Sequence, residues 1–181
     1  MQDMEVNEKK TAVWQLHELS DRMVTYNAGD PKRIQHLIKV HYFARMIGLS
    51  EGLDAATQLI LEATAIVHDI GIRISEKKYG VCDGKHQEQE GPAEARKLLT
   101  EMGTFSEAQI ERICWLVGHH HTYDCIEGMD YQILVEADFL VNIYEDNLPA
   151  DAICKVREKI FKTSAGRALL DTMFGVENNT L

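Results

Sequence analysis

The chain of 181 residues has only three prolines and four cysteines, and it has no long apolar run. No two cysteines form a C-x-x-C pair, which excludes a paired-thiol metal or redox motif and predicts free thiols. No uninterrupted apolar stretch approaches the roughly 20 residues that cross a bilayer, and no apolar leader follows the polar start of the sequence. We therefore expect a cytoplasmic protein with no membrane partner.

Basic residues are also relatively few, because 29 acidic residues outnumber 19 lysines and arginines and give a formal net charge of −10. This charge argues against a nucleic-acid duplex or an anionic membrane surface as the main partner. A small anionic substrate would need local positive charge, and a bound metal ion is the simplest source of it. The length fits one domain with one sizeable core.

Alternating strand-like segments are missing, whereas helical periodicity runs through almost the whole chain. The sequence predicts an all-α, single-domain helical bundle over residues 1–181, with a core at about 31–146 and flanking N- and C-terminal helices. A helix is expected to open at Gly91-Pro92 and to stop at Gly103, after a long irregular loop. The other expected helices cover residues 8–25, 31–47, 54–68, 106–118, 131–145 and 149–174.

The most informative stretch ends the predicted central helix and reads Ile66-Val67-His68-Asp69-Ile70-Gly71. An imidazole and a carboxylate at the last turn of a buried helix would point past its end as a preorganised pair of metal ligands. Gly71 would let the backbone turn away. A histidine at a helix end can also simply cap carbonyl groups, so this pair alone does not establish a site.

Two further ligand-type residues lie on apolar helix faces. His36 shares one face of the 31–47 helix with apolar residues, and Asp138 lies among the apolar residues of the 131–145 helix. A buried carboxylate is costly unless a cation meets it, which favours a ligand role for Asp138. For His36, a core histidine bonded to a backbone carbonyl remains the alternative.

Three consecutive histidines, His119, His120 and His121, follow the 106–118 helix. They cannot all be core residues, because neighbours in a helix or turn point in different directions. A surface cluster without function is the alternative interpretation.

The expected loop over residues 72–90 forms a basic island in an acidic protein, with Arg73 and Lys85 among its cations. This loop could cover the active site and bind phosphate through its cations. The alternative is a solvated surface loop without function.

In order and spacing these residues resemble the HD-domain superfamily of metal-dependent hydrolases, whose pattern is H…HD…D on a helical bundle. The resemblance runs from about Arg33 to Glu145 and includes the His-Asp-Ile-Gly (HDIG) sequence. It implies that the ligands of a first metal ion are His36, His68, Asp69 and Asp138. Some branches of the family hold a second ion, for which the candidate ligands are His86, His120 and His121, with Asp69 spanning both ions.

The resemblance implies a phosphohydrolase that cleaves a phosphomonoester or phosphodiester, with a nucleotide as the expected substrate, by attack of a metal-bound water. Asp69 would be catalytic, because it would orient and partly deprotonate that water. Binding of phosphate by Arg73 or Lys85 is our own inference from the loop. Mixed histidine and carboxylate ligands suit one or two divalent ions, with iron or manganese expected. A homodimer is compatible with the sequence.

Differences between this sequence and the motifs of better-known branches narrow the range of possible substrates. The residues after the His-Asp pair are not acidic, unlike those of the alarmone hydrolases and related nucleotidases, and the Gly-Tyr-Pro motif of the cyclic-dinucleotide phosphodiesterases is missing. His121-Thr122 and Ala137-Asp138 resemble the branch that cleaves symmetrical dinucleoside tetraphosphates, although the glycine after the first dipeptide is missing. Two alternatives of other classes remain: a di-iron oxygenase of the same fold and a non-catalytic nucleotide-binding metal module.

Overall fold

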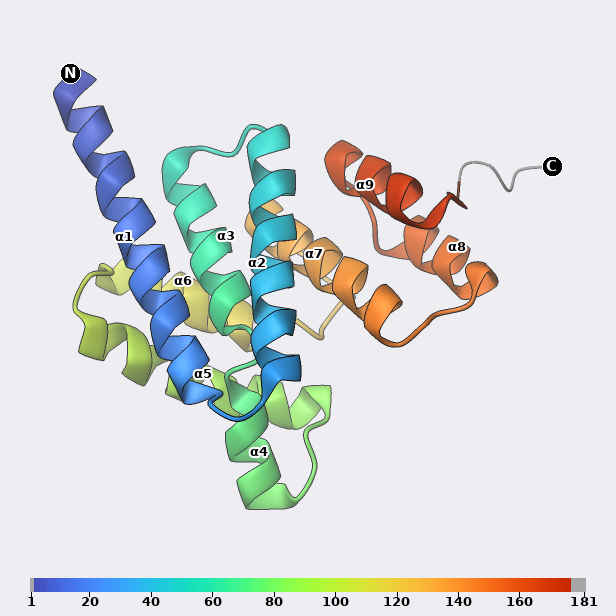
Figure 1. Cartoon of the computed structure of the whole chain (residues 1–181), viewed down its shortest axis with the longest axis horizontal. Coiled ribbons are helices and arrows are strands. Elements are labelled where there is room, and N and C mark those ends of the chain that lie inside the picture. The colour runs from blue at the N-terminus through green and yellow to red at the C-terminus, as the bar shows by residue number, and fades with distance from the viewer. Residues whose placement is uncertain (1, 177–181) are drawn as a thin grey trace.

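The computed structural model describes residues 2–176, with side chains from Thr11 onward, and this part of the chain contains nine α-helices and no strand (Figure 1). The predicted all-α, single-domain fold is confirmed. None of the helices within the described residues is long and apolar enough to cross a membrane. In chain order the helices are α1 (Gln2–Tyr26), α2 (Pro31–Ser50), α3 (Ala55–Val67), α4 (Gly71–Tyr79), α5 (Gly84–Met102), α6 (Glu107–Val117), α7 (Met129–Glu145), α8 (Ala150–Lys159) and α9 (Ser164–Phe174).

Polar caps in the sequence explain where several helices begin. The Asp30 side chain accepts a hydrogen bond from the first turn of α2, which has Pro31 at its first position. The Asp54 side chain caps α3 in the same way. Ser106 and Gln109 form the predicted capping box at the start of α6. These helices therefore begin where the sequence predicts them to begin.

Helix α3 lies at the centre of the fold, with α2 packed along one side and α1 along another (Figure 1). The buried core has two parts, and α3 contributes to both. One part joins α3 to α2 and α7, with Val40, Leu61 and Leu140 among its residues. The other joins α3 to α1, α5 and α6, with Leu19, Ile66 and Ile113 among its residues. The end of α3 is thereby buried between helices that are distant in the sequence.

The prediction of a long loop over residues 72–90 is wrong. Most of this stretch is helical, because α4 runs to Tyr79 and α5 begins at Gly84. Gly80 ends α4 in the left-handed conformation at φ 73°, and Asp83 caps α5. Pro92, expected at the start of a helix, lies inside α5. Helix α5 begins seven residues before Gly91-Pro92, the predicted start, because Asp83 caps it there.

The single helix predicted over residues 149–174 is also wrong, because α8 and α9 are separated by a short link. The buried carboxylate of Glu136 accepts hydrogen bonds from the backbone N–H groups of Lys162 and Thr163, at 2.6 and 2.9 Å. The Thr163 side chain in turn caps α9. The break thus depends on a residue of α7, which local periodicity does not reveal.

Candidate metal centre

The His68-Asp69 pair lies in the short turn between α3 and α4. Gly71 does not turn the chain away as expected but begins α4. A Cβ atom there would lie 2.7 Å from the carbonyl oxygen of Gln87 and 2.9 Å from the backbone nitrogen of Gly91. Glycine is therefore needed because α5 approaches the turn closely.

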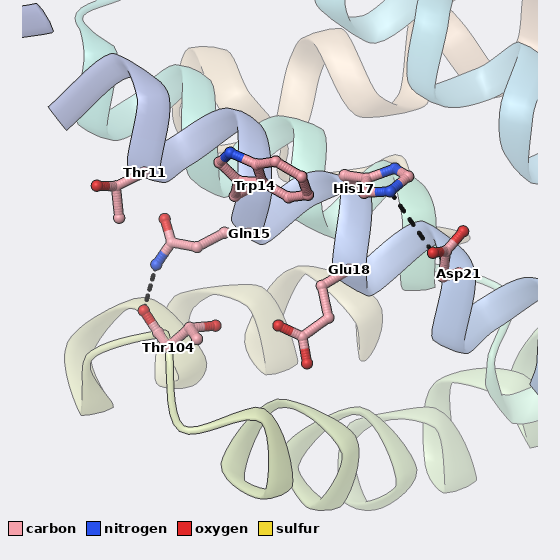
Figure 2. Close-up of a pocket in the computed structure, with 7 residues that line it drawn as sticks. All are labelled: Thr11, Trp14, Gln15, His17, Glu18, Asp21 and Thr104. Carbon is pink, nitrogen blue, oxygen red and sulfur yellow. Dashed lines mark hydrogen bonds and ion pairs between the residues drawn. The ribbon is translucent and has the colours of Figure 1, made fainter. Parts of the chain in front are cut away.

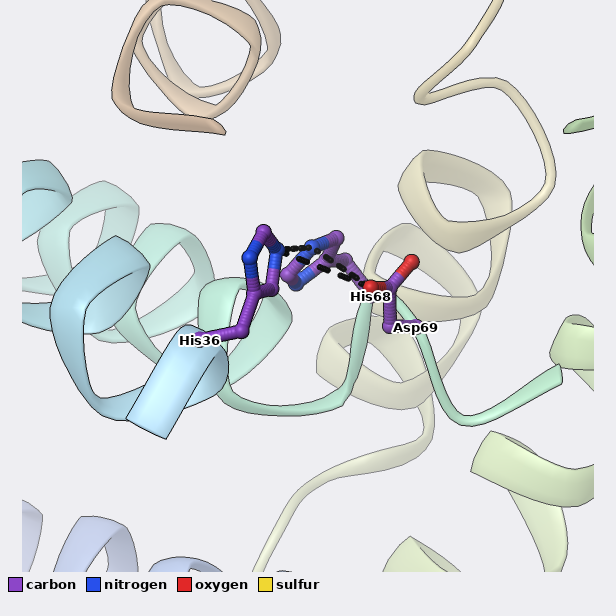
Figure 3. Close-up of side chains that lie close together, drawn as sticks. All are labelled: His36, His68 and Asp69. Atoms are coloured by element: carbon purple, nitrogen blue, oxygen red, sulfur yellow. Dashed lines mark hydrogen bonds and ion pairs between the residues drawn. The ribbon is translucent and has the colours of Figure 1, made fainter. Parts of the chain in front are cut away.

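A first group of donors gathers beside this turn (Figure 3). The Nε2 atoms of His36 and His68 lie 3.3 Å apart, and each lies 3.6 Å from Oδ2 of Asp69. Oδ1 of Asp138, from α7, lies 3.2 Å from Nε2 of His36 and 3.6 Å from Nε2 of His68. Four side chains from α2, α7 and the turn thus converge, and they are the four that the family resemblance implies as ligands of the first ion.

A second group contains Asp69, His120 and His121. Oδ1 of Asp69 lies 3.5 Å from Nε2 of His120, whereas Oδ2 faces the first group. The two oxygens of one carboxylate therefore face two separate sets of histidines. A bridging carboxylate between two metal ions requires this arrangement.

Contacts of Nδ1 on the far side of each ring determine which nitrogen faces the centre. The Nδ1 atoms of His68 and His120 lie 2.9 and 2.7 Å from backbone carbonyl oxygens three residues earlier. A carbonyl only accepts, so Nδ1 carries the proton and Nε2 is left to bind an ion. Nδ1 of His36 lies 3.3 Å from a carboxylate oxygen of Glu145. Histidine ligands in proteins are commonly held in this way.

Two buried atoms of the centre have no hydrogen-bond partner: Nε2 of His120 and Oδ1 of Asp138. A buried polar atom without a partner is costly, and native structures have few of them. Divalent cations held by the two groups would satisfy these atoms, Oδ1 of Asp138 in the first group and Nε2 of His120 in the second. The donors present, imidazole nitrogens and carboxylate oxygens, fit a transition-metal ion.

Opposite charges across the centre keep its carboxylates ionised. Burial alone would raise the pKa of Asp69, but His68 and His120 outweigh burial and hold that pKa well below its usual range. Burial alone would lower the pKa of His68, but Asp69 and Asp138 raise it to about 9. For His121, burial and the neighbouring His120 lower the pKa to about 4.

Two other histidines that attracted attention in the sequence lie outside both groups. His86, in the first turn of α5, has Nδ1 2.8 Å from a carboxylate oxygen of Asp83 and its ring 4.3 Å from that of Tyr79. His119 stacks on Trp115 at 4.2 Å. The structure thus gathers His120 and His121 but does not bring His86 to them, and a ligand role for His86 stays a prediction.

The two cations predicted to bind phosphate lie on α4 and α5. Arg73 donates a hydrogen bond to the backbone carbonyl of Tyr26 and lies over its ring, 5.6 Å from the centroid. Lys85 is exposed in the first turn of α5. Their roles stay predictions.

Sequence reasoning missed Glu145 and Gln87. Glu145 lies seven residues after Asp138, on the same face of α7, and this spacing is a signal that could have found it. Gln87 is buried next to the second group, where its Oε1 lies 3.1 Å from Nε2 of His121. Its position follows from the start of α5 at Asp83, which the sequence interpretation did not use.

A pocket between α1 and the α5–α6 connection lies apart from this centre (Figure 2). Trp14, His17 and Asp21 are among its lining residues, and His17 is paired with Asp21 at 3.6 Å. None of the lining residues belongs to the metal centre. His17 is exposed.

Comparisons with known proteins agree with this centre. The family model of the HD domain matches residues 33–156, which include both donor groups. A solved structure similar to this chain is the crystal structure of a predicted HD superfamily hydrolase from an uncultured Thermotogales bacterium. The two chains are 26% identical with a TM-score of 0.63, and the similarity covers 90% of this chain and 87% of that one. The comparison with curated proteins gave no match. The chain belongs to the HD-domain family.

Proposed function

We propose that this protein is a metal-dependent phosphohydrolase that hydrolyses a phosphomonoester or phosphodiester, with a nucleotide as substrate. The observation that carries the proposal is the position of Asp69, whose two carboxylate oxygens face two separate sets of histidines. Membership of the HD-domain family and similarity to a predicted hydrolase support it.

The two donor groups suit two divalent ions, with iron or manganese the best match to mixed nitrogen and oxygen ligands. His36, His68 and Asp138 would hold one ion together with Oδ2 of Asp69, and His120 and His121 would hold the other together with Oδ1. Ions bound there would lower the pKa of a bound water toward 7 and neutralise charge on the phosphoryl group.

Asp69 is the protein group best placed to act on the attacking water. Its side chain is 25% exposed, whereas those of His68 and His120 are each 1% exposed, so the centre meets solvent at this carboxylate. Asp69 is ionised and can accept a hydrogen bond from the water, which orients it for attack.

Arg73 and Lys85 remain the proposed phosphate-binding residues. Lys85 is exposed in the first turn of α5, the helix whose Gln87 contacts the second donor group. Its flexible side chain would have to turn toward the centre to bind a phosphate as a point charge. Arg73 would have to leave the Tyr26 carbonyl to do the same.

The proposal is tested by chromatographic detection of the hydrolysis products of mononucleotides, dinucleotides and linear dinucleoside polyphosphates, with added Mn²⁺ or Fe²⁺. Wild type should turn over at least one of these substrates, and Asp69→Ala should lose that turnover. Asp146→Ala, which removes an exposed carboxylate outside the centre, is the matched control. Turnover by Asp69→Ala equal to that of wild type would contradict the assignment of Asp69 to the active site.

Two other outcomes would identify the alternatives. The same bridged donor set could serve a di-iron oxygenase, which would consume dioxygen and release no phosphate. Tight nucleotide binding without turnover of any phosphate ester, by protein that still contains metal, would indicate a non-catalytic binding module.

A further inference from the structure

We propose that the side-chain oxygen of Gln87 is a ligand of the second ion, together with Asp69, His120 and His121. This inference rests on the proposed function, because it assumes that the centre holds two ions. It adds a donor from α5 that the family pattern of histidines and aspartates in this chain does not supply.

Glycines seat α5 directly against the centre. A Cβ atom on Gly84 would lie 2.8 Å from the ring of His121, and one on Gly71 would lie 2.7 Å from the carbonyl oxygen of Gln87. Real Cβ atoms are not found at such distances, so both positions require glycine while the helices keep this spacing. The face of α5 that bears Gln87 is therefore fixed between the His-Asp turn and His121.

The orientation of the Gln87 amide is determined by its own hydrogen bonds. Its side chain is buried, with only 7% of the residue exposed, and Nε2 donates to the carbonyl oxygen of Cys82 at 2.8 Å. Because a carbonyl oxygen only accepts, the amide nitrogen must point to Cys82, and Oε1 must point to His121.

The spacing of the two side chains is that of neighbouring ligands on one ion. Oε1 of Gln87 lies 3.1 Å from Nε2 of His121, close to the 3.3 Å between the Nε2 atoms of His36 and His68. Ligand atoms at bonds of about 2.1 Å in an octahedral site lie about 3 Å apart. Both pairs of atoms therefore match two corners of a coordination shell.

The other nitrogen of His121 fits the same role. Its Nδ1 lies 3.5 Å from the hydroxyl oxygen of Tyr123. With its proton on Nδ1, His121 would have an oxygen beside Nδ1 and a free Nε2 beside Oε1 of Gln87. His36, His68 and His120 already have an oxygen beside Nδ1. Ion binding would move the His121 proton from Nε2, where it now bonds to Gln87, to Nδ1.

The preceding residue, His86, is directed to other partners. It is bonded to Asp83 and packed on Tyr79, so α5 presents an amide oxygen to the second group. That oxygen is neutral, and the second group shares its only carboxylate with the first. The second ion should therefore bind more weakly than the first, and manganese should suit its oxygen ligands.

The test is a titration of the metal-free, full-length protein with Mn²⁺. Calorimetry measures the affinity of each ion, and electron paramagnetic resonance detects the bound ions. Wild type should bind two ions, with a coupled spectrum because the ions lie close together. Gln87→Leu should weaken the second ion at least about tenfold, and Gln87→Glu should tighten it about tenfold because it adds charge to the oxygen donor. Gln89→Leu, at an exposed glutamine of the same helix, should change neither affinity.

The outcomes separate this inference from the proposed function. Unchanged second-ion affinity in Gln87→Leu, or an equal loss of affinity in Gln89→Leu, overturns the role of Gln87. One ion per wild-type chain also overturns it while leaving a one-ion hydrolase standing, and no bound Mn²⁺ at all overturns both. Circular dichroism of each variant checks folding, and Gln87→Glu, which has nearly the same shape as wild type, keeps the test valid if Gln87→Leu does not fold.

Discussion

Oε2 of Glu145 lies 3.3 Å from Nδ1 of His36, and the other carboxylate oxygen of Glu145 forms an ion pair with Lys39. Helix α7 thus supplies both Asp138, which faces the centre, and a carboxylate that holds a histidine of α2 from behind. Carboxylate–histidine pairs of this kind set the ring orientation and increase the basicity of the metal-binding nitrogen.

Glu145→Ala should weaken the first ion by about 10- to 100-fold, the usual effect of removing such a partner. The affinity of the second ion should change much less, because His120 is held by a backbone carbonyl instead. Calorimetric titration with Mn²⁺ measures both affinities. Asp146→Ala, at the exposed neighbouring residue, is the control, and equal first-ion affinity in Glu145→Ala and wild type would contradict the role of Glu145.

Metal should stabilise the fold, because the donors come from helices that are distant in the sequence. At a free Mn²⁺ concentration 100 times the dissociation constant, one bound ion adds about 2.7 kcal/mol to the free energy of unfolding. For a chain of this size that corresponds to a rise in melting temperature of about 5–10 °C. Asp69→Ala, which removes the shared ligand, should keep its helical content and lose this rise. Thermal unfolding followed by circular dichroism, with and without Mn²⁺, measures the difference; a similar rise in the variant would show that Asp69 binds neither ion.

Local context in the sequence marks three residues of the first donor group, whereas the fourth, His36, is assigned only through the resemblance to the HD-domain family. His68 and Asp69 are adjacent at the end of an apolar helix, and Asp138 is a carboxylate on an apolar face. These signals depend only on helical periodicity and on the cost of burying charge.

What the sequence did not predict depends on contacts between helices. The direction of the side chains in α5 follows from the helix start at Asp83, so Gln87 faces the centre and His86 faces Asp83. A shift of one residue turns a helix by about 100°, which is enough to exchange a buried position for an exposed one. The link before α9 likewise depends on Glu136, a residue of another helix.

A buried carboxylate outside the centre predicts the acid sensitivity of the fold. Glu62, on α3, is only 2% exposed and contacts His41 at 2.9 Å, Arg45 at 3.0 Å and Gln58 at 2.8 Å. Burial alone would raise the pKa of Glu62, but these partners outweigh burial and hold that pKa below its usual value.

The sign of the effect follows from linkage. Because the pKa of Glu62 is lower in the folded than in the unfolded chain, its contribution to stability is fully present above the unfolded pKa of about 4.3 and is lost as the pH falls through the folded pKa. Glu62→Gln should therefore be less stable than wild type at pH 7, by about 1–3 kcal/mol, the usual value of hydrogen bonds to a charged group. The gap should narrow as the pH falls below the unfolded pKa, because the unfolded chain takes up a proton there and the folded Glu62 does so only at its lower pKa. Urea unfolding of the metal-free proteins at pH 7 and at pH 3.5 measures the difference in stability between wild type and Glu62→Gln. Glu101→Gln, at an exposed position of α5, is the control. A gap of the same size at both pH values would mean that the charge of Glu62 contributes nothing to stability and that only the shape of its side chain matters.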